Sequence, residues 1–299
     1  MRSTSRIGGG LLATALGVTL LSWGWAGRAR GDAEQPAKRL GDEACLECHA
    51  QYAPAWGSVR HNRYLRSDAL KPENRGCEGC HGPGSKHLED PNFRSIKNEK
   101  RGTGLAAVQP CLQCHGADVK AAQWLNTGHS KNGVTCTGCH DVHQSAGNPA
   151  LLRKPKNEMC LSCHPQTKAD FQQNSHHPLI EGRVNCTDCH DPHQSGLGTK
   201  ALLKSGDDKC VRCHMEKRGP FAYEHQTSIN GGDEGCSNCH RSHGSPNPKL
   251  LELFGRATCL QCHSEISTDA NHRPRGGDCW QAGCHTRIHG SHNNRWFIN

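Results

Sequence analysis

The chain begins with a sharp change in polarity. Arg2 and Arg6 precede an uncharged, largely apolar stretch at residues 7–27, and small and polar residues follow it. A basic start, an apolar run and small residues, in this order, predict a secretory signal peptide over residues 1–31, cleaved near residues 27–33. The stretch is also long enough to cross a bilayer, so an uncleaved membrane anchor is the alternative interpretation.

The rest of the chain is polar and has no second apolar run that could span a membrane. Hydrophobic residues make up 33% of the sequence and aromatic residues 5%. An ordinary globular core cannot be built from so few apolar side chains. A large apolar group that is not a side chain therefore has to contribute to the interior.

The cysteines identify that group. All twenty belong to ten motifs in which a histidine directly follows the second cysteine. Nine motifs read Cys-x-x-Cys-His, and the tenth, CWQAGCH at 279–285, has four residues between its cysteines. This is the attachment signature of c-type haem, in which both cysteines form thioethers and the histidine ligates the iron. The predicted attachment cysteines are Cys45, Cys48, Cys77, Cys80, Cys111, Cys114, Cys136, Cys139, Cys160, Cys163, Cys186, Cys189, Cys210, Cys213, Cys236, Cys239, Cys259, Cys262, Cys279 and Cys284. The predicted proximal histidines are His49, His81, His115, His140, His164, His190, His214, His240, His263 and His285.

Zinc ribbons and disulfides are the alternative uses of paired cysteines in an exported chain. Neither requires a histidine directly after the second cysteine. Histidine is only 22 of 299 residues, so its chance placement at all ten positions is negligible. The sequence therefore predicts ten covalently attached haem c groups.

Ten porphyrins supply the apolar mass that the side chains lack. We expect a multihaem cytochrome c fold of mostly irregular coil, with short α-helices at or just after the motifs and almost no β-structure. Without haem the chain is expected to be disordered, as small metal-binding domains are without their metal.

The motifs recur with a period of about 50 residues. One unit consists of a histidine, a first motif, two residues, another histidine, about sixteen residues and a second motif. First motifs begin at Cys136, Cys186 and Cys236, and second motifs at Cys160, Cys210 and Cys259. A looser copy spans the motifs at 77 and 111, and half-units begin at Cys45 and Cys279. These repeats predict an elongated array in which each unit packs mainly on its neighbours.

The remaining histidines are candidates for the second axial position. Each unit has one upstream histidine, namely His61, His129, His176 or His177, His225 and His272. Each also has one just after its first motif, namely His87, His143, His193, His243 and His289 or His292. Ten positions match ten haems, which predicts low-spin bis-histidine iron, with solvated surface histidines as the alternative. Regular spacing favours His177, and proximity to the preceding motif favours His289.

His143 poses a geometric question, because it follows His140 by one helical turn. Both side chains leave the backbone on the same side, so His143 cannot easily reach the far face of the haem that His140 holds. We expect His143 to cap another haem. The haem of residues 160–164 is the nearest candidate along the chain.

Bis-histidine ligation favours electron transfer over catalysis. Six-coordinate iron has no open position for a substrate. No Cys-x-x-Cys-Lys motif, catalytic triad, P-loop or GxGxxG motif is found in the sequence. We therefore expect an electron-transfer protein that is not itself an enzyme.

The formal net charge of +8 does not indicate nucleic-acid binding. The predicted signal peptide contains four of the arginines, and each ferric bis-histidine haem adds about −1. No basic run with interleaved aromatic residues is present. We expect no nucleic-acid partner.

Three phrases carry a family resemblance: CEGCHGPGSKH, HHPLIEGRVNCTDCHDPH and the terminal CHTRIHGSH. Over residues 45–297 the chain resembles the periplasmic decahaem cytochromes of the MtrA and DmsE type. The resemblance implies two pentahaem halves, at residues 32–172 and 173–299, that form a haem wire. It also implies insertion into an outer-membrane β-barrel porin, a periplasmic or inner-membrane cytochrome donor, and an extracellular cytochrome or reductase. CWQAGCH departs from the family pattern, which puts the geometry and potential of the tenth haem in question.

Two other functions stay open at this level. The chain could be a freely diffusing periplasmic electron carrier without a barrel partner. It could also be a multihaem reductase in which one haem is five-coordinate.

Overall fold

The computed structural model describes residues 35–90, 95–97, 104–144, 147–194, 208–225, 235–265, 277–280 and 284–298. The predicted signal peptide and His272 lie outside these residues. Ala37–Asn299 forms one unit by its internal contacts. Within the described residues, no helix is both long and apolar enough to cross a membrane.

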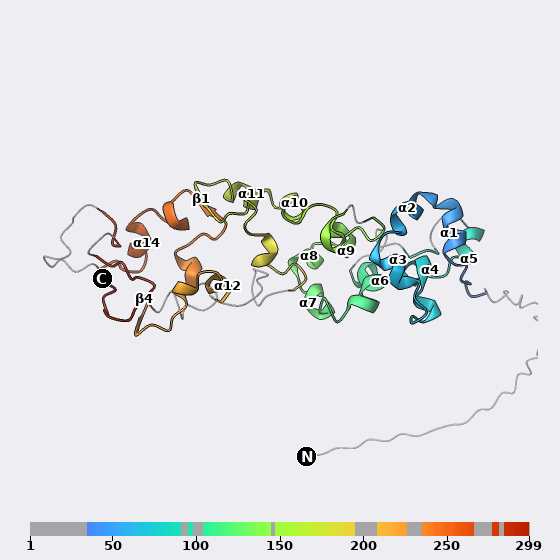
Figure 1. The fold of residues 1–299 in the computed structure, drawn as a ribbon, viewed down its shortest axis with the longest axis horizontal. Coiled ribbons are helices and arrows are strands. Elements are labelled where there is room, and N and C mark those ends of the chain that lie inside the picture. Colours follow the sequence, from blue (N-terminus) through green and yellow to red (C-terminus); the bar gives the residue numbers. More distant parts are fainter. Residues whose placement is uncertain are drawn as a thin grey trace, which may run out of the picture. The chain divides into compact units, whose positions relative to one another are not determined.

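Short helices joined by irregular chain make up most of this unit (Figure 1). The α-helices are α1 (Asp42–Cys48), α2 (Ala53–Trp56), α3 (Arg60–Leu65), α4 (Gly76–His81), α5 (Ser85–Glu89), α6 (Leu105–His115), α7 (Ala121–Leu125), α8 (Gly128–Lys131), α9 (Cys136–Cys139), α10 (Lys156–Leu161), α11 (Pro165–Asp170), α12 (Asp208–Val211) and α14 (Ala257–Leu260). Glycine and proline keep them short: Gly82 ends α4 with φ 81°, and Pro165 begins α11.

The described 3₁₀-helices are η1 (Ala50–Tyr52), η2 (Pro72–Asn74), η4 (Pro149–Leu151), η5 (Cys186–Asp188), η6 (Met215–Lys217), η7 (Gly235–Asn238) and η8 (Pro248–Leu250). Two motifs begin on them, at Cys186 in η5 and at Cys236 in η7. The tighter 3₁₀ turn suits such short pieces.

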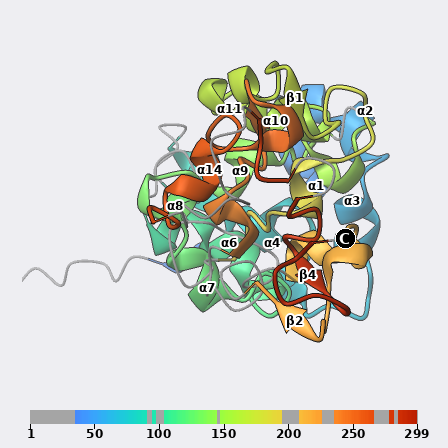
Figure 2. The ribbon, with the colours of Figure 1, turned by 90° about the vertical axis from the view of Figure 1, so that its left-hand side faces the viewer.

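The described β-structure consists of four two-residue strands. Strand β1 (Ser175–His176) pairs antiparallel with β3 (Gly244–Ser245), and β2 (Tyr223–Glu224) pairs antiparallel with β4 (Gly290–Ser291). Figure 2 shows the same predominance of short helices and coil from a second direction. The predicted fold class of mostly coil, short helices and little β-structure is confirmed.

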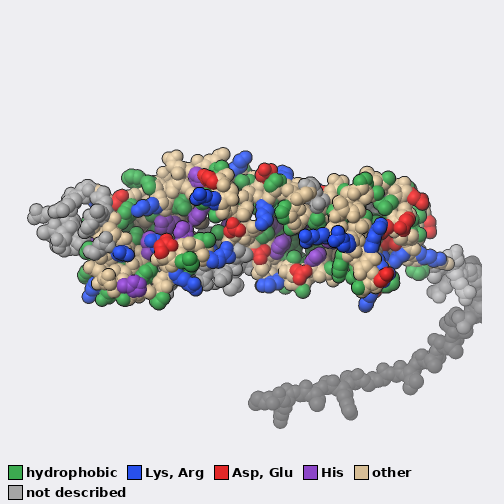
Figure 3. All heavy atoms as spheres, viewed as in Figure 1, with side chains coloured by type: hydrophobic (Ala, Val, Ile, Leu, Met, Phe, Trp, Pro, Cys, Tyr) green, Lys and Arg blue, Asp and Glu red, His purple; other side chains and the backbone are tan. Residues whose placement is uncertain are grey.

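The side-chain core is small. Trp56, Val59 and Leu65 form a buried cluster, against which Leu70, Cys80 and Leu151 pack. Figure 3 shows histidine side chains reaching one face of the molecule among apolar and charged neighbours. Apolar side chains alone therefore do not fill the interior of the described chain.

Candidate haem-binding sites

One backbone hydrogen bond closes nearly every motif into a turn. The histidine amide donates to the carbonyl of the first cysteine at 2.9–3.1 Å in His49, His140, His164, His190, His214, His240 and His263. His81 and His115 are the last residues of α4 and α6. Residues three and four positions apart share one face of a helical turn, so both thiols and the imidazole project to the same side. Attachment to one porphyrin requires this arrangement.

The longer tenth motif closes in the same way. The amide of His285 donates to the carbonyl of Cys279 at 2.9 Å, although two more residues separate them than in the other motifs. Residues 281–283 lie outside the described chain. The closing hydrogen bond supports CWQAGCH as a haem motif.

Replacing Cys279 and Cys284 with alanine is therefore expected to remove one haem. Intact-mass spectrometry should show ten haems on the mature wild-type protein and nine on the double variant, because both thioethers of that haem are lost. Equal haem mass in the two proteins would show that CWQAGCH binds no haem.

Nine proximal histidines lie opposite a second histidine ring at a nearly constant distance. The pairs are His49–His87, His61–His115, His81–His143, His129–His164, His140–His193, His177–His214, His190–His243, His225–His263 and His240–His289. Their centroids are 5.9–6.4 Å apart, whereas the interplanar angles range from 10° to 75°.

A shared metal ion explains this spacing. Two imidazoles on opposite sides of one metal have centroids about 6 Å apart, because each metal–nitrogen bond is about 2 Å long and the ring centre lies roughly 1 Å behind the nitrogen. Direct ring stacking would not hold the distance constant while the angle varies so widely. The paired rings therefore fit an iron held between them.

Backbone carbonyls orient several proximal rings. The Nδ1 atoms of His81, His140, His240 and His285 lie 2.7, 2.7, 2.8 and 2.6 Å from the carbonyl oxygens of Lys97, Ala150, Lys249 and Trp296, respectively. An Nδ1–H that donates to a carbonyl leaves Nε2 as the lone pair for a metal. Ala150 and Lys249 take left-handed backbone conformations, with φ 55° and 59°. Such conformations persist where the surroundings require them, and here they turn a carbonyl toward the ring.

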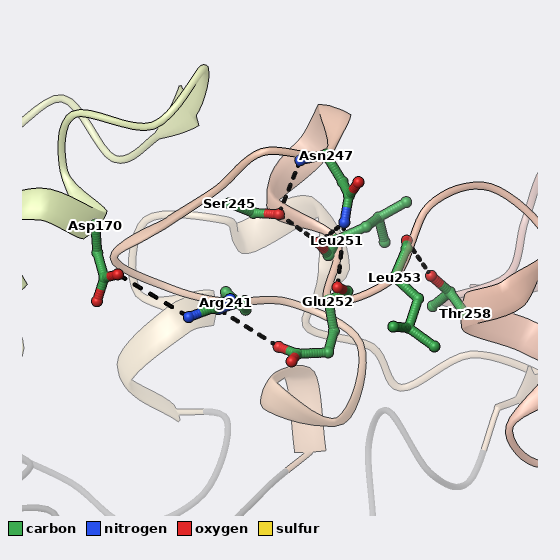
Figure 4. A network of polar contacts seen from close by, with 8 residues as sticks. All are labelled: Asp170, Arg241, Ser245, Asn247, Leu251, Glu252, Leu253 and Thr258. Atoms are coloured by element: carbon green, nitrogen blue, oxygen red, sulfur yellow. Dashed lines mark hydrogen bonds and ion pairs between the residues drawn. The ribbon is translucent and has the colours of Figure 1, made fainter.

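A polar network supports the segment after His240 (Figure 4). Arg241 forms ion pairs with Asp170 at 4.0 Å and Glu252 at 3.6 Å. The Ser245 hydroxyl, which is fully buried, donates to the carbonyl of Leu251 at 2.5 Å. This network ties the segment to α11, which directly follows the motif at 160–164.

Burial keeps candidate second ligands uncharged. Desolvation lowers the pKa of His61, His143, His193 and His225, and it lowers the pKa of His289 to about 4. Neutral imidazole is the form that binds a metal. These rings therefore need not lose a proton to ligate iron at neutral pH.

Comparison with known proteins gives the class of protein. The model of the doubled CXXCH motif family matches residues 129–169, 176–219 and 228–268. Multiheme cytochrome MtrA from Shewanella baltica is 34% identical over 143 residues. The chain is a multihaem c-type cytochrome. Several c-type haems are therefore bound through its CXXCH motifs.

The sequence similarity covers only part of the chain and part of each relative. The alignment with MtrA spans 46% of the chain and 42% of MtrA. Cytochrome c-type protein NrfB from Escherichia coli is 26% identical over 143 residues, which is 46% of the chain and 72% of NrfB. The chain thus spans less than half the length of MtrA.

The histidine pairs of the cytochrome fall into two classes. Within a unit, the upstream histidine lies opposite the proximal histidine of the second motif, in His61–His115, His129–His164, His177–His214 and His225–His263. Between units, the histidine after a first motif lies opposite the proximal histidine of the preceding unit, in His49–His87, His81–His143, His140–His193, His190–His243 and His240–His289. The second class links each unit to the next.

The haem of residues 160–164, the nearest candidate along the chain, is not the one whose proximal ring faces His143. His143 lies 6.0 Å from His81, whereas His164 pairs with His129. Tyr52, which follows the motif at 45–49, also lies against His143, at 4.8 Å between ring centroids. The segment after the motif turns back, so the nearest motif along the chain is not the nearest in space.

The structure also distinguishes between His176 and His177, and between His289 and His292, as second ligands. His177 and His289 lie opposite proximal rings, whereas His176 bonds to Gln173 and Glu181 and His292 lies against Phe221. His272 lies outside the described residues. Its role as a second ligand stays a prediction.

Consecutive motifs of the cytochrome lie close together. The side chains of Cys45 and Cys77, of Cys160 and Cys186, and of Cys259 and Cys279 are close enough to interact. Electrostatic contacts join Cys139 to Cys160, Cys189 to Cys210 and Cys239 to Cys262. Haems attached at these cysteines would have neighbouring edges.

Sequence reasoning missed the aromatic residues beside the second ligands. Trp56 contacts His143, Trp124 contacts His193, and Phe171 contacts His243. A signal was available, because each aromatic residue stands five positions before an upstream histidine or its neighbour in a chain with few aromatic residues. The carbonyl acceptors of the proximal rings carry no side-chain signal.

The interplanar angles predict at least two low-spin ferric populations. The angle between axial imidazole planes sets the splitting of the iron d orbitals. Five pairs are within 20° of parallel, and three exceed 60°. Electron paramagnetic resonance of the oxidised protein should therefore show both rhombic and strongly anisotropic low-spin signals. A stoichiometric high-spin signal that responds to nitrite or cyanide would instead favour a reductase.

Proposed function

We propose that this cytochrome is an electron conduit with ten low-spin bis-histidine haems and no catalytic site. The haems would be attached through the twenty cysteines, and the ten proximal histidines would each bind one iron. The second ligands would be His61, His87, His129, His143, His177, His193, His225, His243, His272 and His289. The pairing of nine proximal rings with a second imidazole is the observation that carries this proposal, because filled axial positions leave no room for a substrate.

The protein would fix the axial ligands of each iron and the distances between neighbouring haems. When bound, haem supplies a one-electron ferric–ferrous couple. The between-unit histidines would connect successive units, and the attachment cysteines of successive motifs lie close together. Transfer between haems is fast only over short distances, so this order of sites supports stepwise transfer along the chain.

The likeness to MtrA supports the location and partners that we propose. The cytochrome would act in the periplasm, held at the outer membrane by a β-barrel porin. It would exchange electrons with a periplasmic or inner-membrane cytochrome on one side and an extracellular cytochrome or reductase on the other. The direction of flow is left open by this proposal.

Purification of the membrane fraction in mild detergent tests the conduit against a diffusing carrier. The haem absorbance should co-elute with a β-barrel protein, which mass spectrometry of the fraction would identify. Elution of the full-length cytochrome alone, with all haems attached, would support the carrier instead.

A further inference from the structure

Two buried tryptophans have an indole N–H that nothing in the described chain accepts. Trp56 and Trp124 are 7% and 6% exposed, and their Nε1 atoms have no hydrogen-bond partner among the described residues. Indole nitrogen is a donor only, and buried donors are nearly always satisfied. Each N–H therefore points to an acceptor that the side chains do not supply.

The two residues occupy equivalent places in successive units. Trp56 stands five residues before His61, and Trp124 stands five before His129. Each ring lies beside the second-ligand histidine of the next unit, at 6.1 Å from His143 and 6.3 Å from His193 between centroids. Because both indole N–H groups lack a partner at equivalent positions, the same kind of acceptor is expected beside each of them.

The surroundings of Trp56 indicate which haem would carry that acceptor. Its cluster contacts Cys80, an attachment cysteine of the motif at 77–81. The proximal histidine of that motif, His81, is the partner of His143. The cluster of Trp56 therefore packs on an attachment cysteine of one predicted haem site, and Trp56 itself lies beside the distal ligand of the same site.

We propose that Trp56 and Trp124 each donate a hydrogen bond to a propionate carboxylate of the haem whose iron the adjacent histidine caps. These are the haems attached at Cys77 and Cys80 and at Cys136 and Cys139. This inference rests on the proposed occupancy and pairing of those two sites. An ionised carboxylate is a strong acceptor for a buried N–H, and a haem c carries two of them. Both tryptophans are positioning residues: each would fix the position of the propionate and, through the hydrogen bond, partly neutralise the negative charge of its carboxylate.

The next unit provides a natural comparison. Phe171 takes the equivalent place, is also 6% exposed, and lies 5.3 Å from His243. Phenylalanine keeps the packing and lacks the donor. A propionate that receives no such bond keeps more negative charge near the iron and favours the ferric state. The haem beside His243 should therefore have a lower potential than the haems beside the two tryptophans.

Trp124→Phe tests the inference by copying the residue that the chain uses at 171. All ten haems should stay attached and low-spin, one midpoint potential should shift downward, and the propionate bending band in resonance Raman spectra should shift. Trp56→Phe should do the same independently at the haem beside His143. Tyr64→Phe is the matched control, because it removes a polar hydrogen from an aromatic side chain that is 58% exposed, and it should change neither signal.

Hydrogen exchange of the indole N–H supplies a second readout. With ¹⁵N-tryptophan labelling, the N–H signals of Trp56 and Trp124 should exchange with D₂O far more slowly than that of Trp296. Variants that keep ten haems but leave both the Raman band and the potentials unchanged would overturn the inference and place a water or no acceptor at the N–H. Loss of haem or low-spin ligation in the wild-type protein would count against the proposed function itself.

Discussion

Replacing His143 with methionine is expected to raise the reduction potential of one haem by on the order of 0.1 V while ten haems stay attached. Attachment requires only the cysteines and the proximal histidine. Methionine as an axial ligand favours the ferrous state more than histidine does. The affected haem should be the one at residues 77–81, because His143 lies 6.0 Å from His81.

In a linear conduit this change should slow end-to-end transfer strongly. A haem of raised potential retains the electron, and escape to the next haem becomes about tenfold less favourable for every ~59 mV. Proteoliposomes that contain the cytochrome, its barrel partner and a trapped reductant would measure the transfer rate. A diffusing carrier would lose little, since electrons can enter and leave at other haems.

His292→Met is the matched control for this experiment. It makes the same change at a histidine that lies against Phe221 and opposite no described proximal ring. The control should leave spectrum, potentials and rate unchanged. The same lack of effect in His143→Met would mean that His143 is not an axial ligand.

Gly244→Ala is expected to destabilise the protein and expose one iron. A Cβ at Gly244 would collide with the backbone carbonyl of Asp170, where β3 pairs with β1. Overpacking of this kind costs about 1–3 kcal/mol in the free energy of unfolding. Because His243 precedes this glycine, the shift should also pull its ring away from His190. Thermal unfolding and carbon monoxide binding by the reduced protein would measure the two effects.

Gly128→Ala provides the comparison. A Cβ at Gly128, in α8, would meet nothing within 4 Å. Stability should stay the same or rise by about 0.5–1 kcal/mol, and no carbon monoxide should bind. Equal behaviour of the two variants would show that the close approach at Gly244 does not hold His243 in place.

The covalent sites were predictable from sequence because attachment chemistry is local. Each motif places its ligands within one turn, so Cys136, Cys139 and His140 could be assigned without knowledge of the fold. The short helices and near absence of β-structure followed from low apolar content and frequent glycine and proline. The periodic spacing also favoured His177 over His176, and His177 is the ring that lies opposite His214.

The identity of each partner was not predictable in the same way. His143 pairs across units with His81 because the chain reverses after the motif, and a reversal of that kind depends on backbone conformations such as that of Ala150. The signal peptide and the two pentahaem halves stay predictions. The tryptophan donors could have been noticed by their spacing, but their missing acceptor is visible only in three dimensions.

Anomalous diffraction at the iron edge from crystals of the haem-loaded protein tests the central claim most directly. The account predicts ten iron peaks, of which nine lie midway between the paired rings described above, including one between His81 and His143. The tenth should lie beside His285. Fewer peaks, or irons bound by one histidine each with His143 turned into solvent, would contradict a bis-histidine array linked from unit to unit.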